Sequence, residues 1–171
     1  TQGFAADTVH EDFAAWGRFL GAEYGRQVDW WVTINEPFAY LAGGYLQTNF
    51  PPGAPFDPAL VLRVVRNMVK SHVAAYDALH EADTVTVAPA TAAGPARPAW
   101  VSIASHNRVW RPARPDNEDD VAAARHIGYL NNLLFLNAIV RGDVDDDGDG
   151  AYTSPTDRRD DPAWRGRADY V

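Results

Sequence analysis

The sequence predicts an α/β fold in which helices alternate with the strands of a parallel sheet. Three stretches carry apolar residues at helical spacing, and two apolar runs of strand length lie between them. This order is the one expected of βα units around a parallel sheet. Hydrophobic residues make up 46% of the 171 residues, which is typical of a packed globular protein and excludes a disordered or fibrous chain.

The charge balance excludes several kinds of partner. The 15 basic side chains are outnumbered by 23 acidic ones, so the formal net charge is −8, and nucleic-acid phosphates and anionic membranes are repelled on average. We therefore expect no nucleic-acid and no membrane partner, whereas a neutral sugar meets no net repulsion. The absence of cysteine excludes disulfides and thiol catalysis. We expect a soluble protein, with the cytoplasm favoured as its compartment.

The first helix and the first strand are predicted near the start of the chain. Thr8 and Glu11 have the spacing of a capping box, and the apolar residues that follow recur at helical spacing until Gly25 can end the helix. The next run, residues 28–34 (VDWWVTI), is almost wholly β-branched or aromatic. Because polar residues do not alternate with apolar ones in it, we predict a strand that is buried on both faces.

The second βα pair is predicted after a stretch rich in glycine and proline. Asp57 and Pro58 are suited to the cap and the first position of a long helix. Two runs beyond that helix have the composition of a strand, residues 84–89 (TVTVAP) and 100–105 (WVSIAS), and we favour the second.

The third helix and a further strand are predicted in the last part of the chain. The helix begins in the acidic run 116–120, because acidic side chains suit the positive end of a helix dipole, and it ends before Gly142. The closing run, residues 168–171 (ADYV), predicts the start of another strand.

One tripeptide is suited to acid/base chemistry. Asn35, Glu36 and Pro37 directly follow the first strand, so a carboxylate is expected at the carboxyl end of a buried strand, where barrel enzymes have their active sites. Pro37 disfavours a right-handed helical backbone at Glu36 and favours a helical turn after it. A carboxyl held rigidly at such a corner can protonate a leaving glycosidic oxygen and then accept a proton from water. The alternative is a plain helix cap, with Asn35 as cap and Glu36 as a first-turn acid.

The tripeptide lies in a longer string, WWVTINEPFAYLAGGY, that resembles the fourth-strand signature of glycoside hydrolase family 1. Other segments resemble the family in the same order: FAAWGRFLGAEYGRQVDWW, NFPPG, NMVKSHVAAYDALHEA, VSIASHNRVWRPA, NNLLFLNAIVRGD and RGRADYV. The resemblance implies an α/β fold that is part of a (β/α)8 TIM barrel, from about the third helix to the start of the sixth strand. Residues 1–171 would then form a single fragment of one catalytic domain.

The resemblance also implies a function. It predicts a retaining β-glycosidase of the β-glucosidase type that acts on a small β-glycoside or oligosaccharide without a cofactor. The family's roles then carry over to Glu36 as general acid/base and to Asn35 as the ligand of the sugar 2-hydroxyl. The family's nucleophile is a second glutamate, in a Glu-Asn-Gly motif on the seventh strand, which no residue of this sequence matches. We therefore expect the isolated stretch to be poorly folded and inactive.

Three further side chains are candidates for contact with a substrate or its leaving group. His106, Asn107 and Trp110 follow the strand 100–105 and would lie at the mouth of the barrel, where aromatic faces commonly pack on sugars. The alternative for all three is ordinary packing of a loop.

An acidic run resembles a calcium loop in part. Four aspartates recur at every second position: Asp143, Asp145, Asp147 and Asp149. This spacing matches the start of an oxygen-ligand calcium site, but the twelfth position counted from Asp143 is Ser154 and not the glutamate that such a loop needs. We favour a solvated acidic turn over a calcium site.

Two other functions stay open from the sequence. One is another TIM-barrel glycosidase with Asn-Glu at the end of its fourth strand, such as a cellulase or mannanase relative. The other is a non-catalytic carbohydrate- or calcium-binding protein built on a barrel remnant.

Overall fold

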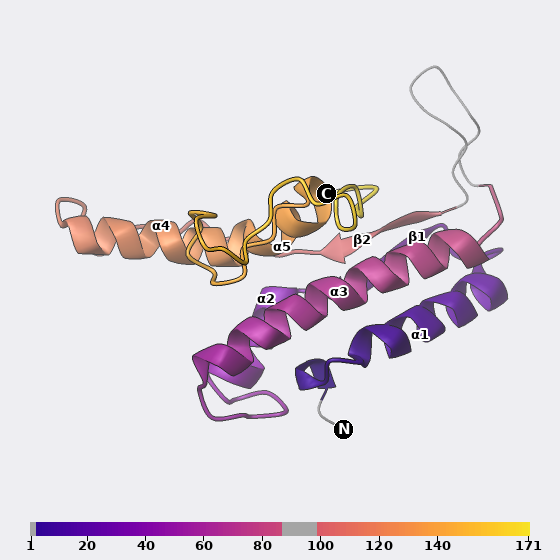
Figure 1. Cartoon of the computed structure of the whole chain (residues 1–171), viewed down its shortest axis with the longest axis horizontal. Coiled ribbons are helices and arrows are strands. Elements are labelled where there is room, and N and C mark those ends of the chain that lie inside the picture. The colour runs from indigo at the N-terminus through magenta and orange to yellow at the C-terminus, as the bar shows by residue number, and fades with distance from the viewer. Residues whose placement is uncertain (1–2, 87–98) are drawn as a thin grey trace, which may run out of the picture.

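A computed structural model of the chain describes residues 3–86 and 99–171 (Figure 1). Two helices, α1 and α3, run side by side along the two strands, η3 packs against α3, and α4 reaches beyond the arrowhead end of β2 (Figure 1). The elements in chain order are η1 (Gly3–Ala5), α1 (Val9–Tyr24), β1 (Trp30–Asn35), α2 (Pro37–Leu41), η2 (Ala42–Leu46), α3 (Pro58–Ala82), β2 (Trp100–Ala104), α4 (Glu118–Asn132), α5 (Leu134–Leu136) and η3 (Asn137–Arg141). The described part therefore alternates helices and strands, as the sequence predicts.

Helix α1 confirms the first predicted helix but not its capping box. It ends where expected, because the N–H of Gly25 donates to the carbonyl of Gly21. At its start, Thr8 has a helical backbone (φ −94°, ψ −2°), and its side chain makes no capping hydrogen bond. The N–H of Glu11 donates instead to the main-chain carbonyl of Thr8 at 2.9 Å, which satisfies that donor without the hydroxyl.

Helix α3 begins at the predicted cap and contacts α1 closely. The carboxylate of Asp57 accepts hydrogen bonds from the N–H groups of Ala59 and Leu60 at 3.0 and 3.4 Å. Along the contact with α1, a Cβ atom added to Gly17 would lie only 3.1 Å from the carbonyl oxygen of Ala75. The two helices can approach this closely because α1 carries no side chain at that point.

The two strands form a parallel pair, and their carboxyl ends therefore meet at one edge. Trp30 pairs with Trp100 at the start, and Asn35 pairs with Ala104 at the end, with an irregularity between Val32 and Asn35. Strand β2 confirms the preference for residues 100–105 over 84–89. Of the rejected run, residues 84–86 have no strand structure, and residues 87–89 lie outside the described residues.

The expectation that the first strand is buried on both faces is wrong for the described residues. Trp30 and Val32 are 59% and 50% exposed, whereas Trp31 and Thr33 between them are partly buried, and Thr33 contacts His72 of α3. Successive side chains of a strand point to opposite faces, and α3 covers only one of these faces. The strand is thus half-covered despite its apolar composition.

The last third of the described chain contains the predicted helix but no third strand. Asn117 caps α4, since its side chain accepts a hydrogen bond from the N–H of Asp120 at 2.9 Å. After a break at Leu133, helical structure continues through α5 and η3 and ends at Gly142. The closing run lies beside β2 without forming a strand. The N–H of Asp169 donates to the carbonyl of Val101 at 2.9 Å, but the N–H of Val101 donates to the Asp169 carboxylate. A side chain therefore takes the place of one main-chain ladder bond.

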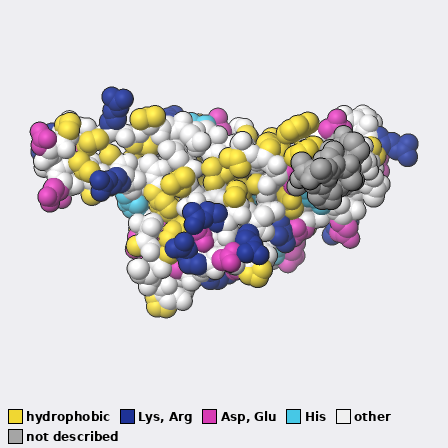
Figure 2. Space-filling view, turned by 90° about the horizontal axis from the view of Figure 1, so that it is seen from above, with side chains coloured by type: hydrophobic (Ala, Val, Ile, Leu, Met, Phe, Trp, Pro, Cys, Tyr) yellow, Lys and Arg dark blue, Asp and Glu magenta, His cyan; other side chains and the backbone are white. Residues whose placement is uncertain are grey.

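The core contains residues of both strands, of α2, η2, α3, α5 and η3, and of the C-terminal segment. Its buried members are Ile34, Leu41, Tyr45, Val64, Val65, Met68, Val69, Ile103, Leu134, Phe135, Ala138, Ile139, Val144 and Trp164. Large apolar side chains also reach the surface, Trp16 and Phe56 among them, and Figure 2 shows hydrophobic side chains spread along one face of the molecule. In the part of the chain that the structure covers, no helix combines the length and apolarity needed to cross a bilayer.

His72 on α3 is fully buried, and both of its ring nitrogens have hydrogen-bond partners. Its Nε2 atom lies at the carbonyl oxygen of Arg167, and its Nδ1 atom lies 2.6 Å from the hydroxyl of Thr33 on β1. Because a carbonyl only accepts, Nε2 carries the proton and Nδ1 accepts from Thr33. Burial lowers the pKa of His72 from 6.5 to about 4. The side chain is therefore neutral at neutral pH and joins α3 to β1.

The lowered pKa of His72 predicts a loss of stability in acid. As the pH falls from 6.5 towards 4, the unfolded chain binds a proton at this residue while the folded chain does not, so the free energy of unfolding falls by about 3 kcal/mol. Urea unfolding of the full-length wild-type protein across this range should show the loss. His72→Gln keeps an N–H donor but cannot titrate, so its curve should lack this component. Parallel pH dependences of the two proteins would contradict the assignment.

Candidate active site

Glu36 has a left-handed backbone at the junction of β1 and α2. Its φ of 48° and ψ of 63° are uncommon for a residue other than glycine and cost on the order of 1 kcal/mol. The conformation is held on both sides of the residue. The N–H of Glu36 donates to Ala104 on β2 at 2.7 Å, and its carbonyl accepts from the N–H of Ala39 at 2.9 Å. Pro37, which is buried, begins α2 as the sequence predicts.

The carboxylate of Glu36 is partly exposed and lies beside a histidine from the second strand's loop. The side chain of Glu36 is 44% exposed, and its Oε2 atom is 3.4 Å from Nδ1 of His106. The parallel pairing explains this proximity, because Glu36 follows the end of β1 and His106 follows the end of β2. The structure therefore brings together Glu36 and one of the three predicted loop residues.

The other predicted site residues lie at the end of β1 and in the loop after β2. Asn35 is exposed at the last position of β1, and Asn107 is exposed in the loop after β2. Trp110 contacts α4, since its Nε1 atom donates a hydrogen bond to the side chain of Asn131 at 3.2 Å. Trp110 is still 37% exposed, so one part of the ring stays open to solvent.

Two asparagines on α4 hold the loop after β2, and sequence reasoning missed both. The side chain of Asn132 accepts from the N–H of Arg108 at 2.9 Å and donates to the carbonyl of Arg108 at 2.8 Å. The side chain of Asn131 donates to the carbonyl of His106 at 3.2 Å. The signal in the sequence was the Asn-Asn pair itself, because a side-chain amide can both donate to and accept from a neighbouring backbone.

A cavity of about 310 Å³ lies between this loop and the turns that follow Glu36. Its lining combines apolar side chains, such as Phe38 and Phe50, with His106, Trp110 and Asn131. Apolar walls with a few polar groups are typical of small-molecule sites. The cavity could accept the apolar part of a ligand whose polar part lies at Glu36.

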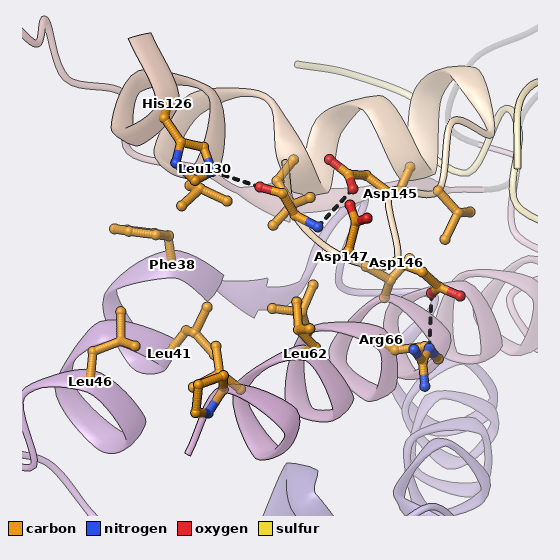
Figure 3. Close-up of a pocket in the computed structure, with 18 of the residues that line it drawn as sticks. Phe38, Leu41, Leu46, Leu62, Arg66, His126, Leu130, Asp145, Asp146 and Asp147 are labelled. Carbon is orange, nitrogen blue, oxygen red and sulfur yellow. Dashed lines mark hydrogen bonds and ion pairs between the residues drawn. The ribbon is translucent and has the colours of Figure 1, made fainter. Parts of the chain in front are cut away.

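A second cavity, of about 320 Å³, is less suited to a sugar (Figure 3). It lies between α2, α3 and α4 and is walled mainly by aliphatic side chains, among them Leu41, Leu62 and Leu130. Figure 3 shows Asp145, Asp146 and Asp147 at one side of it, with Asp146 paired to Arg66 at 3.0 Å. A sugar needs hydrogen-bond partners on many sides, and these walls offer few.

The acidic loop brings three of its four predicted residues together. Ligand atoms of Asp145, Asp147 and Asp149 lie within 4.8 Å of one another. Asp143 points elsewhere and pairs with Arg141 and with another arginine of the C-terminal segment, each at 3.1 Å. The predicted four-aspartate set is therefore reduced to three carboxylates.

Hydrogen bonds within the loop give these carboxylates different affinities for protons. Burial opposes ionisation of Asp145, but hydrogen bonds from Tyr129 and the N–H groups of Gly150 and Gly148 outweigh it and lower its pKa. Partial desolvation and then the neighbouring Asp145 carboxylate raise the pKa of Asp147. The hydroxyl of Tyr129 lies 2.6 Å from Asp145, and the same two effects, burial and this hydrogen bond, raise the pKa of Tyr129.

Comparison with known proteins gives a family match over most of the chain. The family model described as Glycosyl hydrolase family 1 matches residues 1–153. Beta-glucosidase A of Thermotoga maritima is 31% identical over 142 residues, and the beta-galactosidase of Pyrococcus woesei is 30% identical over 142 residues. The aligned regions cover 82% and 81% of this chain but only 28% and 27% of those proteins. The chain thus spans less than a third of the length of these relatives.

Solved structures of family 1 beta-glucosidases also match this chain. The family 1 b-glucosidase from Thermotoga maritima matches with a TM-score of 0.67 at 29% identity, over 84% of this chain and 29% of that chain. The beta-glucosidase from Thermotoga maritima in complex with glucoimidazole matches with a TM-score of 0.68 at 29% identity, again over 84% and 29%.

The geometry of the acidic loop predicts that it needs no ion. Each carboxylate already accepts N–H groups of the loop, for example Gly148 to Asp145 at 2.7 Å and Ala151 to Asp149 at 2.6 Å. Calorimetric titration with calcium should therefore give no saturable heat. Binding that Asp147→Asn abolishes, and that the exposed control Asp119→Asn on α4 keeps, would overturn this expectation.

Proposed function

The chain belongs to glycosyl hydrolase family 1, and from this premise we propose that Glu36 is the general acid/base of a retaining β-glycosidase. One observation carries the proposal. A carboxylate stands at the carboxyl end of a parallel strand, on a backbone that β2 and α2 hold in a left-handed conformation. Strained residues of this kind cluster at active sites, where the surrounding structure fixes them. Family membership favours this function over the cellulase- or mannanase-like and non-catalytic alternatives.

The proposed reaction has two steps, and Glu36 moves a proton in each. In the first, the protonated carboxyl of Glu36 gives its proton to the glycosidic oxygen while the bond to the anomeric carbon breaks. A second carboxylate attacks that carbon, so a glycosyl-enzyme ester forms and the alcohol leaves. In the second, the Glu36 carboxylate takes a proton from water, the water oxygen bonds to the anomeric carbon, and the ester carboxylate is released.

The second carboxylate must come from outside this chain in the proposal. The relatives are more than three times as long as the matched region, and the chain has no Glu-Asn-Gly motif. We infer that these residues form part of a (β/α)8 barrel and that the exposed faces of Trp30 and Val32 point into its interior. A reading frame that continues into such a motif would support this, and a gene that ends at Val171 would contradict it.

The substrate in this proposal is a small β-glycoside. Relatives carry the names beta-glucosidase and beta-galactosidase, and one solved relative holds glucoimidazole, so a sugar of similar size is expected here. Asn35 would bind the 2-hydroxyl of that sugar. The open part of Trp110, which lines the cavity beside the loop, and the exposed Asn107 of that loop would face the leaving group.

Replacement of Glu36 by glutamine tests the acid/base role in the full-length enzyme. Glutamine cannot give a proton, so kcat/KM for an alkyl β-glucoside, whose leaving group needs protonation, should fall about 10²- to 10⁴-fold. The loss should be much smaller for a dinitrophenyl β-glucoside, whose leaving group departs as an anion.

The matched control for this test is Glu23→Gln, the same change at an exposed position of α1. It should leave the rates for both substrates unchanged. Equal losses for the two substrates in Glu36→Gln would refute the acid/base assignment, and full activity on both would refute any role in catalysis.

A further inference from the structure

His106 lies between Arg108 and Glu36 and contacts both. The Nε atom of Arg108 donates to Nε2 of His106 at 2.7 Å. On the other side of the ring, Nδ1 lies 3.4 Å from Oε2 of Glu36. The imidazole therefore links a guanidinium to the candidate acid/base carboxyl.

The contact with Arg108 decides which ring nitrogen of His106 carries the proton. A guanidinium has donors and no acceptor, so Nε2 of His106 must accept, and the proton of the neutral ring must be on Nδ1. Nδ1 is the nitrogen that faces Glu36, which gives the carboxyl a donor on its Oε2 side. A contact of this kind shortens in the reactive complex.

Arg108 is itself fixed by α4. The side chain of Asn132 makes two hydrogen bonds to the backbone of Arg108, one to its N–H and one to its carbonyl. The series of contacts therefore runs from a helix through Asn132, Arg108 and His106 to Glu36. Asn132 fixes the backbone of Arg108, and the guanidinium of Arg108 donates to Nε2 of His106, which leaves Nδ1 as the donor that faces Glu36.

We propose that His106 is a positioning residue for Glu36, with its tautomer set by Arg108. The proposal rests on the acid/base role of Glu36 and adds how its carboxyl is oriented. A carboxyl has two oxygens, and only the protonated one can serve the leaving group. An N–H that faces Oε2 makes this oxygen the acceptor and leaves Oε1 as the oxygen that gives and retakes the proton.

This role differs from the contact with substrate that the sequence predicts for His106. A residue that only contacts the leaving group should affect substrates according to the shape of that group. A residue that positions the proton donor should affect them according to how much protonation the leaving group needs. The two roles are therefore separable with leaving groups of similar size and different acidity.

The test compares His106→Leu with His106→Asn in the full-length enzyme. Kinetics on a series of aryl β-glucosides of similar size gives the dependence of kcat/KM on the pKa of the leaving group. His106→Leu should lose about 10- to 100-fold on the poorest leaving group, as expected for a misplaced catalytic group, and less than a few-fold on the best. His106→Asn places an amide N–H near the position of Nδ1 and should recover part of the loss. Rates on the best leaving group also report that each variant is folded.

Arg108→Met tests the role of the arginine in the same series. Without the donor at Nε2, the ring can carry its proton on either nitrogen, so a smaller loss with the same dependence on leaving group should appear. In a His106→Leu background, Arg108→Met should cause no further loss of kcat/KM, because both changes remove the same interaction. The matched controls are His10→Leu on α1 and the exposed Arg111→Met, which should leave the series unchanged.

The outcomes separate this inference from the function on which it rests. If Glu36→Gln shows the dependence on leaving group but His106→Leu loses equally on all substrates, the positioning role is overturned and the acid/base role stands. If Glu36→Gln shows no such dependence, the proposed function itself fails. Additive losses of His106→Leu and Arg108→Met would overturn the coupling between these two residues.

Discussion

The hydrogen bond from the N–H of Glu36 to the carbonyl of Ala104 is the contact on which the site depends. This bond continues the parallel pairing of β1 and β2 to the residue after Asn35. It therefore fixes the point at which β1 ends. Because Pro37 begins a helix directly afterwards, the chain must turn within one residue, and Glu36 takes the left-handed conformation that allows it. The direction of its Cα–Cβ bond then follows from the pairing of two strands, which are rigid elements.

The described part of the sheet has only two strands, and buried polar side chains connect these strands to α3. His72 joins Thr33 to the carbonyl of Arg167, and Asp169 accepts hydrogen bonds from His80, Tyr76 and the N–H of Val101. Burial opposes the charge of Asp169, but these donors outweigh it and lower the pKa of its carboxyl. Since buried polar groups are costly when unpaired, this network specifies how the C-terminal segment lies against the sheet.

Local signals in the sequence were sufficient for some features and not for others. The cap at Asp57 and the corner at Pro37 follow from a few neighbouring residues, so both could be predicted. The exposure of Trp30 could not, because it depends on which elements cover each face and not on the composition of the strand. The contact of His106 with Glu36 joins residues 70 positions apart and follows only from the parallel register. Asp143 is separated from the other aspartates by its pairing with Arg141 and with Arg159, which comes 16 positions later.

Position and orientation of the candidate acid/base carboxyl have separate causes in this structure. The strained backbone fixes where the side chain of Glu36 starts, but rotation about its side-chain bonds still lets the two oxygens exchange places. Only a neighbouring side chain can distinguish them, and in the described residues His106 is the one within reach of Oε2. That neighbour is in turn supported from α4 through Arg108 and Asn132. Delivery of a proton from one defined oxygen therefore needs both the strand pairing, which positions Glu36, and the loop held by α4, which distinguishes its two oxygens. Neither interaction can replace the other.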